Sequence, residues 1–517
     1  MEGHQTKQIK GHPLIRITSI SGFFTFSTGI DLRIFQVIKQ FSHLGDDVVV
    51  SHLSRNQKNI FHKNEIFFSD ISKNWWDIPY YNQVVNEKRI MAVDEELRPI
   101  AILTSGPISL DSIASLETEL EMALQSSDIP LPQGMLSWHA MNHELDSSTI
   151  THIAQRLRRL GAAFNAIGDE HVGDDQTSKM YDARENVQSY AKTLKGNQII
   201  CWLDSDLEFS ALVQDENGLS VKQPWPWIHM VWHFALNNKD VDFAVADVTG
   251  DPPIPSSSTI LTNLRDLAQI GELSNGERWS IRDPAYDLSD QDRPRVRFPP
   301  IGQDWSGGDL ANLMLWRGTL NRPLVASASV LNKPHRPWYV RGGITVVFNK
   351  SVLNKPTPRF ICNGQSIRRG DSFWLIRILM EKGIAAGHFP FPMLHRRSST
   401  VCDSSELVQS FQSRFFADLF GAAALKGTVQ SLENRDDNLH DCIKNALLSR
   451  ASHSVNVLSE ALETLPLVNG ELSKTDFTLI DAALTNTIAK LKFVDVEGSA
   501  LELHEQIQQF LEVKSDA

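Results

Sequence analysis

Short runs of hydrophobic residues alternate with longer stretches of helical spacing over the central part of the chain. The longer stretches place apolar residues three or four apart, which is typical of helices with one buried face. The short runs carry few polar residues, as strands buried on both faces of a sheet do. This alternation predicts an α/β fold with a mostly parallel sheet and helices on both of its faces. The predicted strands are 99–104, 134–138, 161–167, 199–203, 241–248 and 344–348, and the predicted helices are 110–125, 145–160, 180–194 and 369–383.

The two ends of the chain show different patterns. Residues 1–95 mix strand-like runs with one helix-like stretch, which predicts an N-terminal accessory α+β segment. From residue 403 onward, apolar residues recur at helical spacing to the end of the chain, and Ser473 opens one of these helices like a capping box. We therefore predict three parts: the accessory segment 1–95, a catalytic α/β domain 96–400, and an all-helical region 401–517.

The composition is that of an ordinary soluble globular protein, with 41% hydrophobic and 22% charged residues in 517. A formal net charge of -12 argues against general nucleic-acid binding, because that requires a basic face. The 4 cysteines form no Cys-x-x-Cys pair, which argues against a zinc site or a disulfide framework and favours a reducing compartment. Since the N-terminus lacks a signal-peptide core and no window has the length of a membrane span, we expect a cytoplasmic protein without a transmembrane segment. Secretion by a route that leaves no N-terminal signal stays open.

Asp204-Ser205-Asp206 directly follows the strand predicted at 199–203 and changes this picture. Open α/β sheets bind ligands beyond the carboxyl ends of their strands. Side chains two residues apart in an extended segment point the same way, so the two carboxylates suit one hard cation, Mn²⁺ or Mg²⁺. Such an ion neutralises a diphosphate leaving group. The alternative is a turn or a helix cap, which is the commoner use of this tripeptide.

A helix, a Lys195-Gly196-Asn197 turn, a buried strand and Asp-x-Asp, in this order, resemble the nucleotide-sugar half of the GT-A type glycosyltransferases, family 2 in particular. In that superfamily a basic segment with an Arg-x-Asn-like pattern precedes the strand, and Lys179, Arg184 and Asn186 match it here. The resemblance covers about residues 97 to 400. It implies a GT-A type, Rossmann-like mixed sheet and a nucleoside-diphosphate sugar donor whose diphosphate is bound through a metal held by Asp204 and Asp206.

The resemblance places further residues at the donor. In GT-A proteins the ends of the first and third strands hold the base and the ribose, which makes Thr104, Ser105 and Asp169 candidates. Each of these three also fits a turn or cap. Gly342 and Gly343 match a glycine-bearing segment that lies under the donor sugar, where the missing side chains let a ligand approach the backbone.

The family's acidic residue beside the acceptor is matched by Asp371, in the first turn of a predicted helix. The implied role is a general base that deprotonates the acceptor hydroxyl in an inverting transfer. The alternative is a helix cap. Gly370 stands where the commoner form of this segment has Glu. Many relatives supply a further histidine ligand downstream, for which His395 is the first choice and His388 the second, the alternative being an ordinary surface or core histidine.

The sequence therefore predicts a metal-dependent glycosyltransferase that moves a sugar from a nucleoside-diphosphate sugar to an acceptor hydroxyl. It identifies neither the sugar, the base nor the acceptor. One alternative is a nucleotidyltransferase of the same fold, which is disfavoured because the loop at 104–110 carries no basic residue. Another is a non-catalytic binding or scaffold protein that has kept the fold. For the C-terminal helices we expect packing on the catalytic domain, partner binding or self-association, because they lack the basic polar face of a membrane-surface helix.

Overall fold

The computed structural model describes residues 24–25 and 67–68 and, with short gaps, 97–268, 310–317, 343–395 and 402–512. Contacts divide the chain into two compact units, Met1–Ala92 with Ala326–His335, and Val93–Val325 with Arg336–Ala517. In the first unit β1 (Phe24–Thr25) pairs antiparallel with β2 (Phe67–Phe68). The rest of the α+β segment predicted at 1–95 lies outside the described residues.

A mixed sheet organises the second unit, with strand order β5-β4-β3-β6-β11-β10-β14-β7 among the residues described. Neighbours β5, β4, β3 and β6 run parallel, as do β10 and β14, whereas β11 runs antiparallel to both β6 and β10. The α/β class is thus confirmed as a mixed sheet with helices. The strands are β3 (Ile100–Thr104), β4 (Leu136–Met141), β5 (Ala162–Ile167), β6 (Ile199–Leu203), β7 (Leu207–Glu208), β10 (Phe243–Gly250), β11 (Ile344–Val347) and β14 (Ala386–His395).

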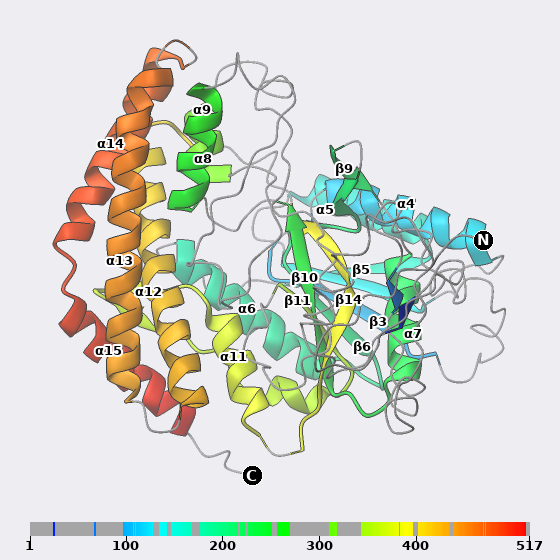
Figure 1. The fold of residues 1–517 in the computed structure, drawn as a ribbon. Coiled ribbons are helices and arrows are strands. Elements are labelled where there is room, and N and C mark those ends of the chain that lie inside the picture. The colour runs from blue at the N-terminus through cyan, green and yellow to red at the C-terminus, as the bar shows by residue number, and fades with distance from the viewer. Residues whose placement is uncertain are drawn as a thin grey trace, which may run out of the picture. The chain divides into compact units, whose positions relative to one another are not determined.

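Helices join the parallel strands as βαβ units (Figure 1). Each strand and helix predicted between residues 99 and 383 is present, with ends displaced by a few residues at most. α6 and α11 cover one face of the sheet, where Val187 and Trp374 pack with Ile200 and Val245. The helices of this part are α4 (Leu110–Ser127), α5 (Ser147–Arg159), α6 (Gln176–Thr193), α7 (Trp227–Asn237), α8 (Ser257–Ala268), α9 (Leu310–Asn312) and α11 (Gly370–Leu379).

Shorter elements complete this part of the chain. β8 (Ala211–Asp215) and β9 (Gly218–Lys222) form one hairpin, and β12 (Ile361–Cys362) and β13 (Gln365–Ser366) form another. A π-helical turn, η3 (Leu313–Arg317), follows α9, and η5 (Lys350–Asn354) is a 3-10 turn after β11.

The order of strands reverses at β3, because β4 and β5 continue on one side of it while β6 lies on the other. In open α/β sheets, ligands bind outside the carboxyl ends of the strands at such a reversal. Thr104 pairs with Leu203, so β3 and β6 end at the same level. A ligand-binding site is therefore expected at the residues that follow β3 and β6.

One prediction about strands is wrong. The segments around His388 and His395 were expected to follow a short strand, but both lie within β14 itself. This strand pairs in parallel with β10 and antiparallel with β7, with His395 opposite Leu207.

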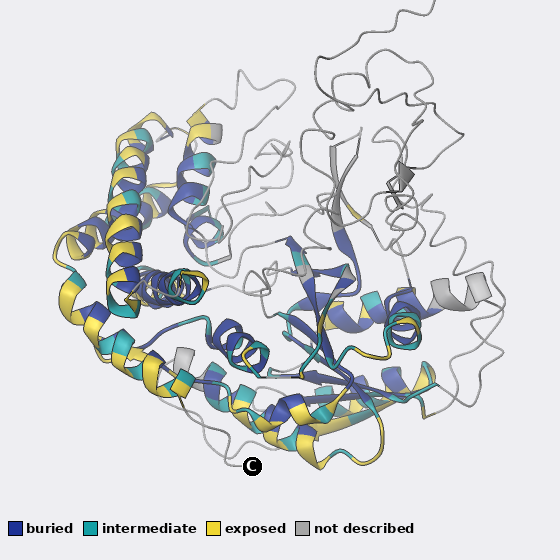
Figure 2. Cartoon of the chain, turned by 60° about the horizontal axis from the view of Figure 1, so that its bottom comes forward, coloured by how far each residue is buried: buried dark blue, intermediate teal, exposed yellow. Residues whose placement is uncertain are grey.

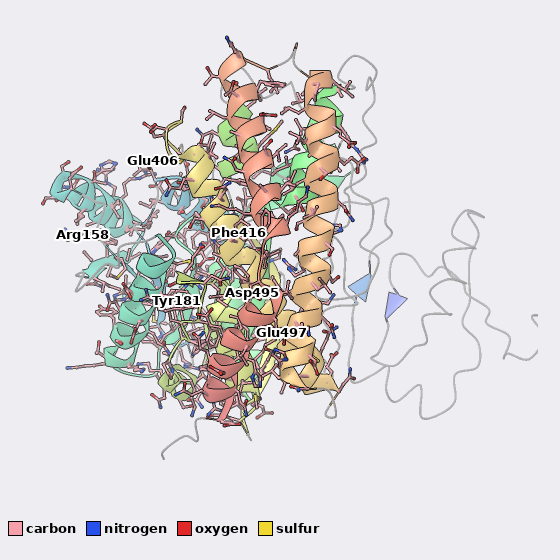
Figure 3. The ribbon with its side chains drawn as sticks, turned by 90° about the vertical axis from the view of Figure 1, so that its left-hand side faces the viewer. Arg158, Tyr181, Glu406, Phe416, Asp495 and Glu497 are labelled. Atoms are coloured by element: carbon pink, nitrogen blue, oxygen red, sulfur yellow. The ribbon has the colours of Figure 1, made fainter. Side chains whose placement is uncertain are left out.

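From Leu407 onward the described chain is helical, in α12 (Leu407–Glu433), α13 (Leu439–Thr464), the 3-10 turn η6 (Leu465–Val468), α14 (Lys474–Lys492) and α15 (Val496–Glu512). As predicted, Ser473 caps α14 by accepting a hydrogen bond from the backbone N–H of Asp476. Figure 3 labels Asp495 and Glu497, where α14 passes into α15. These helices bury their inner faces together with residues of α8, η3 and α11, and Figure 2 shows that buried positions line the sides on which they pack.

Candidate functional site

The Asp204-Ser205-Asp206 segment is a turn between β6 and β7. Asp204 donates its backbone N–H to the carbonyl of Gly343 (3.1 Å), and Leu207 N–H reaches the carbonyl of Asp204 (3.4 Å). Asp204 and Asp206 were predicted to point the same way because the segment was expected to be extended. The segment is a turn instead, so this reason for a shared direction does not hold. The turn nevertheless presents both carboxylates with partial exposure, 38% for the side chain of Asp204 and 33% for that of Asp206.

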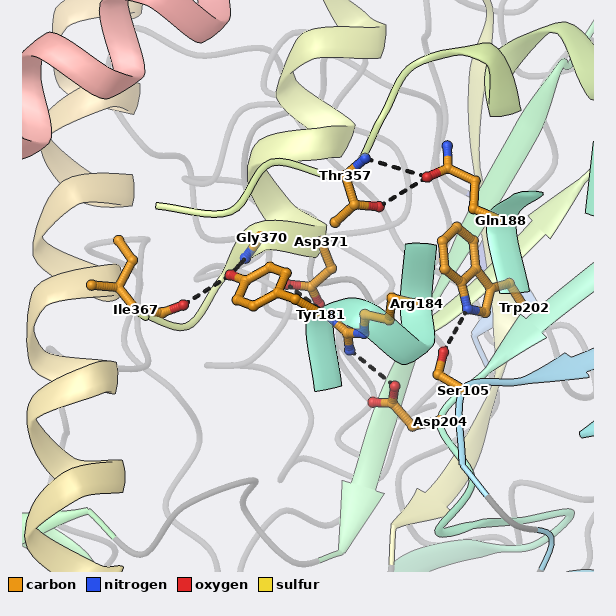
Figure 4. Close-up of polar contacts among 10 residues, drawn as sticks. All are labelled: Ser105, Tyr181, Arg184, Gln188, Trp202, Asp204, Thr357, Ile367, Gly370 and Asp371. Atoms are coloured by element: carbon orange, nitrogen blue, oxygen red, sulfur yellow. Dashed lines mark hydrogen bonds and ion pairs between the residues drawn. The ribbon is translucent and has the colours of Figure 1, made fainter. Parts of the chain in front are cut away.

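Arg184 on α6 joins two of the predicted site carboxylates (Figure 4). Its Nη2 donates to Asp204 Oδ1 (3.1 Å), and its Nη1 lies 3.9 Å from Asp371 Oδ1. Only 11% of the Arg184 side chain is exposed. Burial alone would lower its pKa, but the attraction of Asp371 and Asp204 outweighs this and raises it, so Arg184 is a fixed positive charge between them.

Burial and the neighbouring charges act on the pKa of Asp204 in opposite directions. Desolvation raises its pKa above the ordinary value, Arg184 acts in the lowering direction, and the negative charges of Asp206 and Asp371 add to the rise. A divalent cation at this turn would relieve the repulsion between these carboxylates. The electrostatics of the turn thus suit a positively charged ligand.

His395 lies at the end of β14 and faces the same turn. Its Nε2 is 2.8 Å from Asp206 Oδ2, and its side chain is 5% exposed. The pairing of β14 with β7 sets this position, since His395 stands opposite Leu207. Gly250, with φ +90, permits it, because a Cβ there would lie 2.4 Å from the His395 carbonyl oxygen. Carboxylates suit Mg²⁺ and Mn²⁺, and imidazole is a common metal ligand in proteins, so these residue types can bind a divalent metal.

The three predicted ligands do not form a ready-made metal cage. Within the described part of the chain, no group of three or more His, Cys, Asp or Glu side chains is arranged to hold a metal ion. What the structure brings together is the pair Asp206 and His395, with Asp204 at the start of the same turn.

Asp371 lies in the first turn of α11, with 25% of its side chain exposed. The N-cap residue of this helix is Arg369, in a left-handed conformation with φ 82, and its side chain makes no cap hydrogen bond. Tyr181 on α6 fixes the loop before the helix, because its hydroxyl donates to the Ile367 carbonyl (2.8 Å) and accepts from Gly370 N–H (3.1 Å). Asp371 therefore starts a helix whose position α6 helps to set.

The loop after β3 approaches the Asp-x-Asp turn closely. A Cβ on Gly106 would lie 2.5 Å from Ser205 Oγ and 3.1 Å from Ser205 Cβ, so the two segments are in contact here and a side chain at this position would require Ser205 to move. Ser105 Oγ accepts a hydrogen bond from Trp202 Nε1 (3.1 Å). Thr104, by contrast, is buried within the sheet. Only 1% of it is exposed, and its hydroxyl accepts a hydrogen bond from the indole N–H of Trp138 (3.4 Å).

The remaining predicted residues divide into two groups. Gly343 lies beside the site, since a Cβ built there would be 3.6 Å from Asp204 Oδ2, and Asn186 is half-buried on α6. Asp169 and Gly342 lie outside the described residues, as do the side chains of Lys179 and His388. Sequence reasoning missed Tyr181, for which the only signal was its position three residues before Arg184 on the same helix.

No helix in the described ranges has the length and apolar character needed to cross a membrane. A comparison of the chain with models of protein families finds no match, and a comparison with curated proteins finds none either.

Proposed function

We propose that this chain is a metal-dependent glycosyltransferase of the GT-A type, which transfers a sugar from a nucleoside-diphosphate sugar to an acceptor hydroxyl with inversion. One observation carries the proposal. Residues from four separate segments gather at the carboxyl end of β6, through the contacts of Arg184 with Asp204 and Asp371 and of His395 with Asp206. The family resemblance named each of these residues separately, and a chance resemblance gives no reason for them to meet.

Asp204, Asp206 and His395 would hold the metal, Mn²⁺ or Mg²⁺. When bound, it would offset the negative charge that develops on the departing nucleoside diphosphate. The imidazole favours Mn²⁺ over Mg²⁺, because Mg²⁺ prefers oxygen ligands.

Arg184 and Asp371 have distinct roles in this scheme. Arg184 holds the Asp204 carboxylate by a hydrogen bond and keeps a positive charge between it and Asp371. Asp371 takes the proton from the acceptor hydroxyl as that oxygen attacks the sugar carbon, while the bond from that carbon to the diphosphate breaks. The carboxylate is suited to this because it is partly exposed and its helix makes no side-chain cap bond at the N-cap.

The loop after β3 favours sugar transfer over nucleotidyl transfer. A nucleotidyltransferase uses basic side chains in this loop to hold the triphosphate, but residues 104–110 contain none. The loop also approaches the Asp-x-Asp turn closely, at Gly106 and Ser205.

The test measures sugar transfer and donor hydrolysis with Mn²⁺ and UDP-, GDP-, CDP- and ADP-sugars. Asp371→Asn should keep metal-dependent nucleotide binding but lose transfer by about 10²- to 10⁴-fold, the usual contribution of a general base. Asp204→Asn should lose both binding and transfer. Asp441→Asn, which changes an exposed carboxylate on α13, is the matched control and should behave as wild type.

Two results would count against the proposal. Full transfer by Asp204→Asn would remove the site from the Asp-x-Asp turn. Absence of donor binding and turnover with every nucleotide would instead favour the scaffold alternative.

A further inference from the structure

The loop that carries the proposed base is held by two helices from distant parts of the chain. On one side, Tyr181 of α6 is 3% exposed and binds the loop at both the Ile367 carbonyl and the Gly370 N–H. On the other side, α12 contacts the residues between them. The backbone leading into Asp371 is therefore fixed from both sides.

The contact with α12 is made backbone to backbone. Arg368 N–H donates to the carbonyl of Ala417 (2.9 Å). Gly421, one turn further along α12, lies so close that a Cβ there would be 2.2 Å from the Arg368 carbonyl oxygen. The helix thus packs directly on the loop, with no side chain between them.

A buried ion pair extends this contact. Arg369 Nη2 lies 2.8 Å from Asp418 Oδ1 on α12, and Arg450 Nη2 on α13 lies 3.8 Å from Asp418 Oδ2. The side chains of Arg369, Asp418 and Arg450 are 13%, 9% and 5% exposed. One carboxylate therefore stands between two arginines that have little access to water, so removing it would leave buried charge uncompensated.

Arg369 holds a backbone conformation that a residue with a side chain rarely adopts, with φ 82. Such a conformation persists where the surroundings impose it. Here the surroundings that hold Arg369 include its ion pair with Asp418 and the hydrogen bond at Arg368. Since Arg369 is the N-cap of α11, its conformation sets the direction in which the helix and Asp371 leave the loop.

We infer that Asp418 is a positioning residue for Asp371, so that the C-terminal helices are part of the catalytic apparatus. Asp418 touches neither substrate nor metal in this account, and it acts through Arg369 on the backbone that orients the base. The catalytic part of this inference rests on the proposed function, whereas the coupling between Asp418 and the loop stands on the contacts alone.

The test compares wild type, Asp418→Asn and Glu460→Gln by amide hydrogen exchange and by kinetics. Glu460→Gln is the control, because it removes an exposed carboxylate of α13 whose partner, Arg265 of α8, lies outside the loop. Asp418→Asn should speed amide exchange over 367–373 and lower kcat about tenfold or more, as small misplacements of catalytic groups do. Its KM for the donor and its metal-dependent nucleotide binding should stay within about twofold of wild type, because the donor site is not displaced. The control should change none of these.

A second variant keeps the inference testable if Asp418→Asn folds poorly. Arg369→Gly suits the left-handed backbone at this position and removes the same ion pair. It should also lower kcat, and the double variant should lose no more than the more impaired single variant, because the two residues act through one contact.

The outcomes separate the two levels of the inference. Unchanged exchange over 367–373 in a folded Asp418→Asn would overturn the coupling. Faster exchange with an unchanged kcat, or losses that multiply in the double variant, would overturn the positioning role. If wild type turns over no donor at all, the proposed function and the catalytic role fail together, while the exchange data still decide whether Asp418 holds the loop.

Discussion

Gly370 stands where the acidic segment that this part of the sequence resembles commonly carries Glu, and the surroundings of Gly370 explain the difference. A Cβ at this position would lie 2.4 Å from Tyr181 Cε1, 2.6 Å from the Tyr181 hydroxyl and 2.8 Å from the Pro358 carbonyl oxygen. No side chain fits there while Tyr181 keeps its two hydrogen bonds to the loop. The position of Tyr181 therefore requires glycine at residue 370. Asp371 is then the carboxylate that this segment retains.

Gly370→Ala should lower the free energy of unfolding by about 1 to 3 kcal/mol, the usual effect of overpacking a tight site. Gly470→Ala is the control, because nothing lies within 4 Å of a Cβ there, and its effect should stay within about 0.5 kcal/mol. Denaturant unfolding measures both variants. A Gly370→Ala protein as stable as wild type would mean that Tyr181 does not hold the loop in this way.

The family resemblance, together with the position of Asp-x-Asp after a predicted strand, named the charged residues of the candidate site. Asp204, Asp371 and His395 stand next to predicted strands or helices, and the family resemblance gave each a role. Tyr181 and Asp418 were not predicted, because their importance comes from contacts with a loop almost 190 and 50 positions away in the sequence, and hydrophobic periodicity carries no information on such contacts.

At the scale of elements, strands with plain hydrophobic runs were predicted well and β14 was not. Its sequence contains Pro390 and Pro392, and proline ordinarily argues against a strand inside a sheet. The structure accommodates both in an irregularity, since Ala246 of β10 pairs with Phe389 but Val248 pairs with Met393. The prolines fall in the part of β14 that the ladder skips, an arrangement that depends on the neighbouring strand and is absent from the local pattern.

The first turn of α7 is bound by a buried glutamate of α4. Glu119 of α4 is 0% exposed, and its Oε1 accepts a hydrogen bond from the Ile228 N–H in the first turn of α7 (2.9 Å). Within the described residues its Oε2 has no hydrogen-bond partner. Burial raises the pKa of Glu119 to about 8, so the folded chain keeps it protonated where the unfolded chain ionises it.

Because the pKa of Glu119 is raised in the folded chain, we can predict how its contribution to stability changes with pH. A carboxyl with a raised folded pKa contributes stability that is present below its unfolded pKa of 4.5 and lost as the pH rises to about 8. At 1.36 kcal/mol per pH unit this loss has an upper bound of roughly 5 kcal/mol. Glu119→Gln cannot ionise and still offers an acceptor to Ile228, so its unfolding free energy relative to wild type should increase as the pH rises from 6 to 8.

Denaturant unfolding at several pH values measures this difference. Glu117→Gln on the same helix is the control, because the hydrogen bond from Arg156 lowers the pKa of Glu117 and its contribution is constant above pH 6. A Glu119→Gln difference that does not vary with pH would show that Glu119 is ionised in the folded protein.

At the scale of the whole second unit, the C-terminal helices share a core with earlier parts of the chain. One buried cluster joins Leu264 of α8, Met314 of η3 and Phe373 of α11 to Phe411 and Leu458 of the C-terminal helices. Apolar stripes predicted that these helices bury one face, but a stripe does not say what covers it. The predicted division at residue 400 thus has a continuous core on both sides of it, and the residues at the end of β6 belong to the same compact unit as the C-terminal helices.

The central claim is that Asp204 and Asp206 bind a nucleoside diphosphate through a divalent metal, and thermal unfolding tests it most directly. Purified wild type and Asp204→Ala would be melted with Mn²⁺ alone and with Mn²⁺ plus UDP, GDP, CDP or ADP. A ligand that binds only the folded protein, present at about 100 times its Kd, adds about 2.7 kcal/mol, which corresponds to a rise in Tm of roughly 3 °C for a unit of this size. We predict such a rise with one nucleotide, dependent on Mn²⁺ and lost in Asp204→Ala. A rise that persists in Asp204→Ala, or no rise with any of the four nucleotides, would contradict the account.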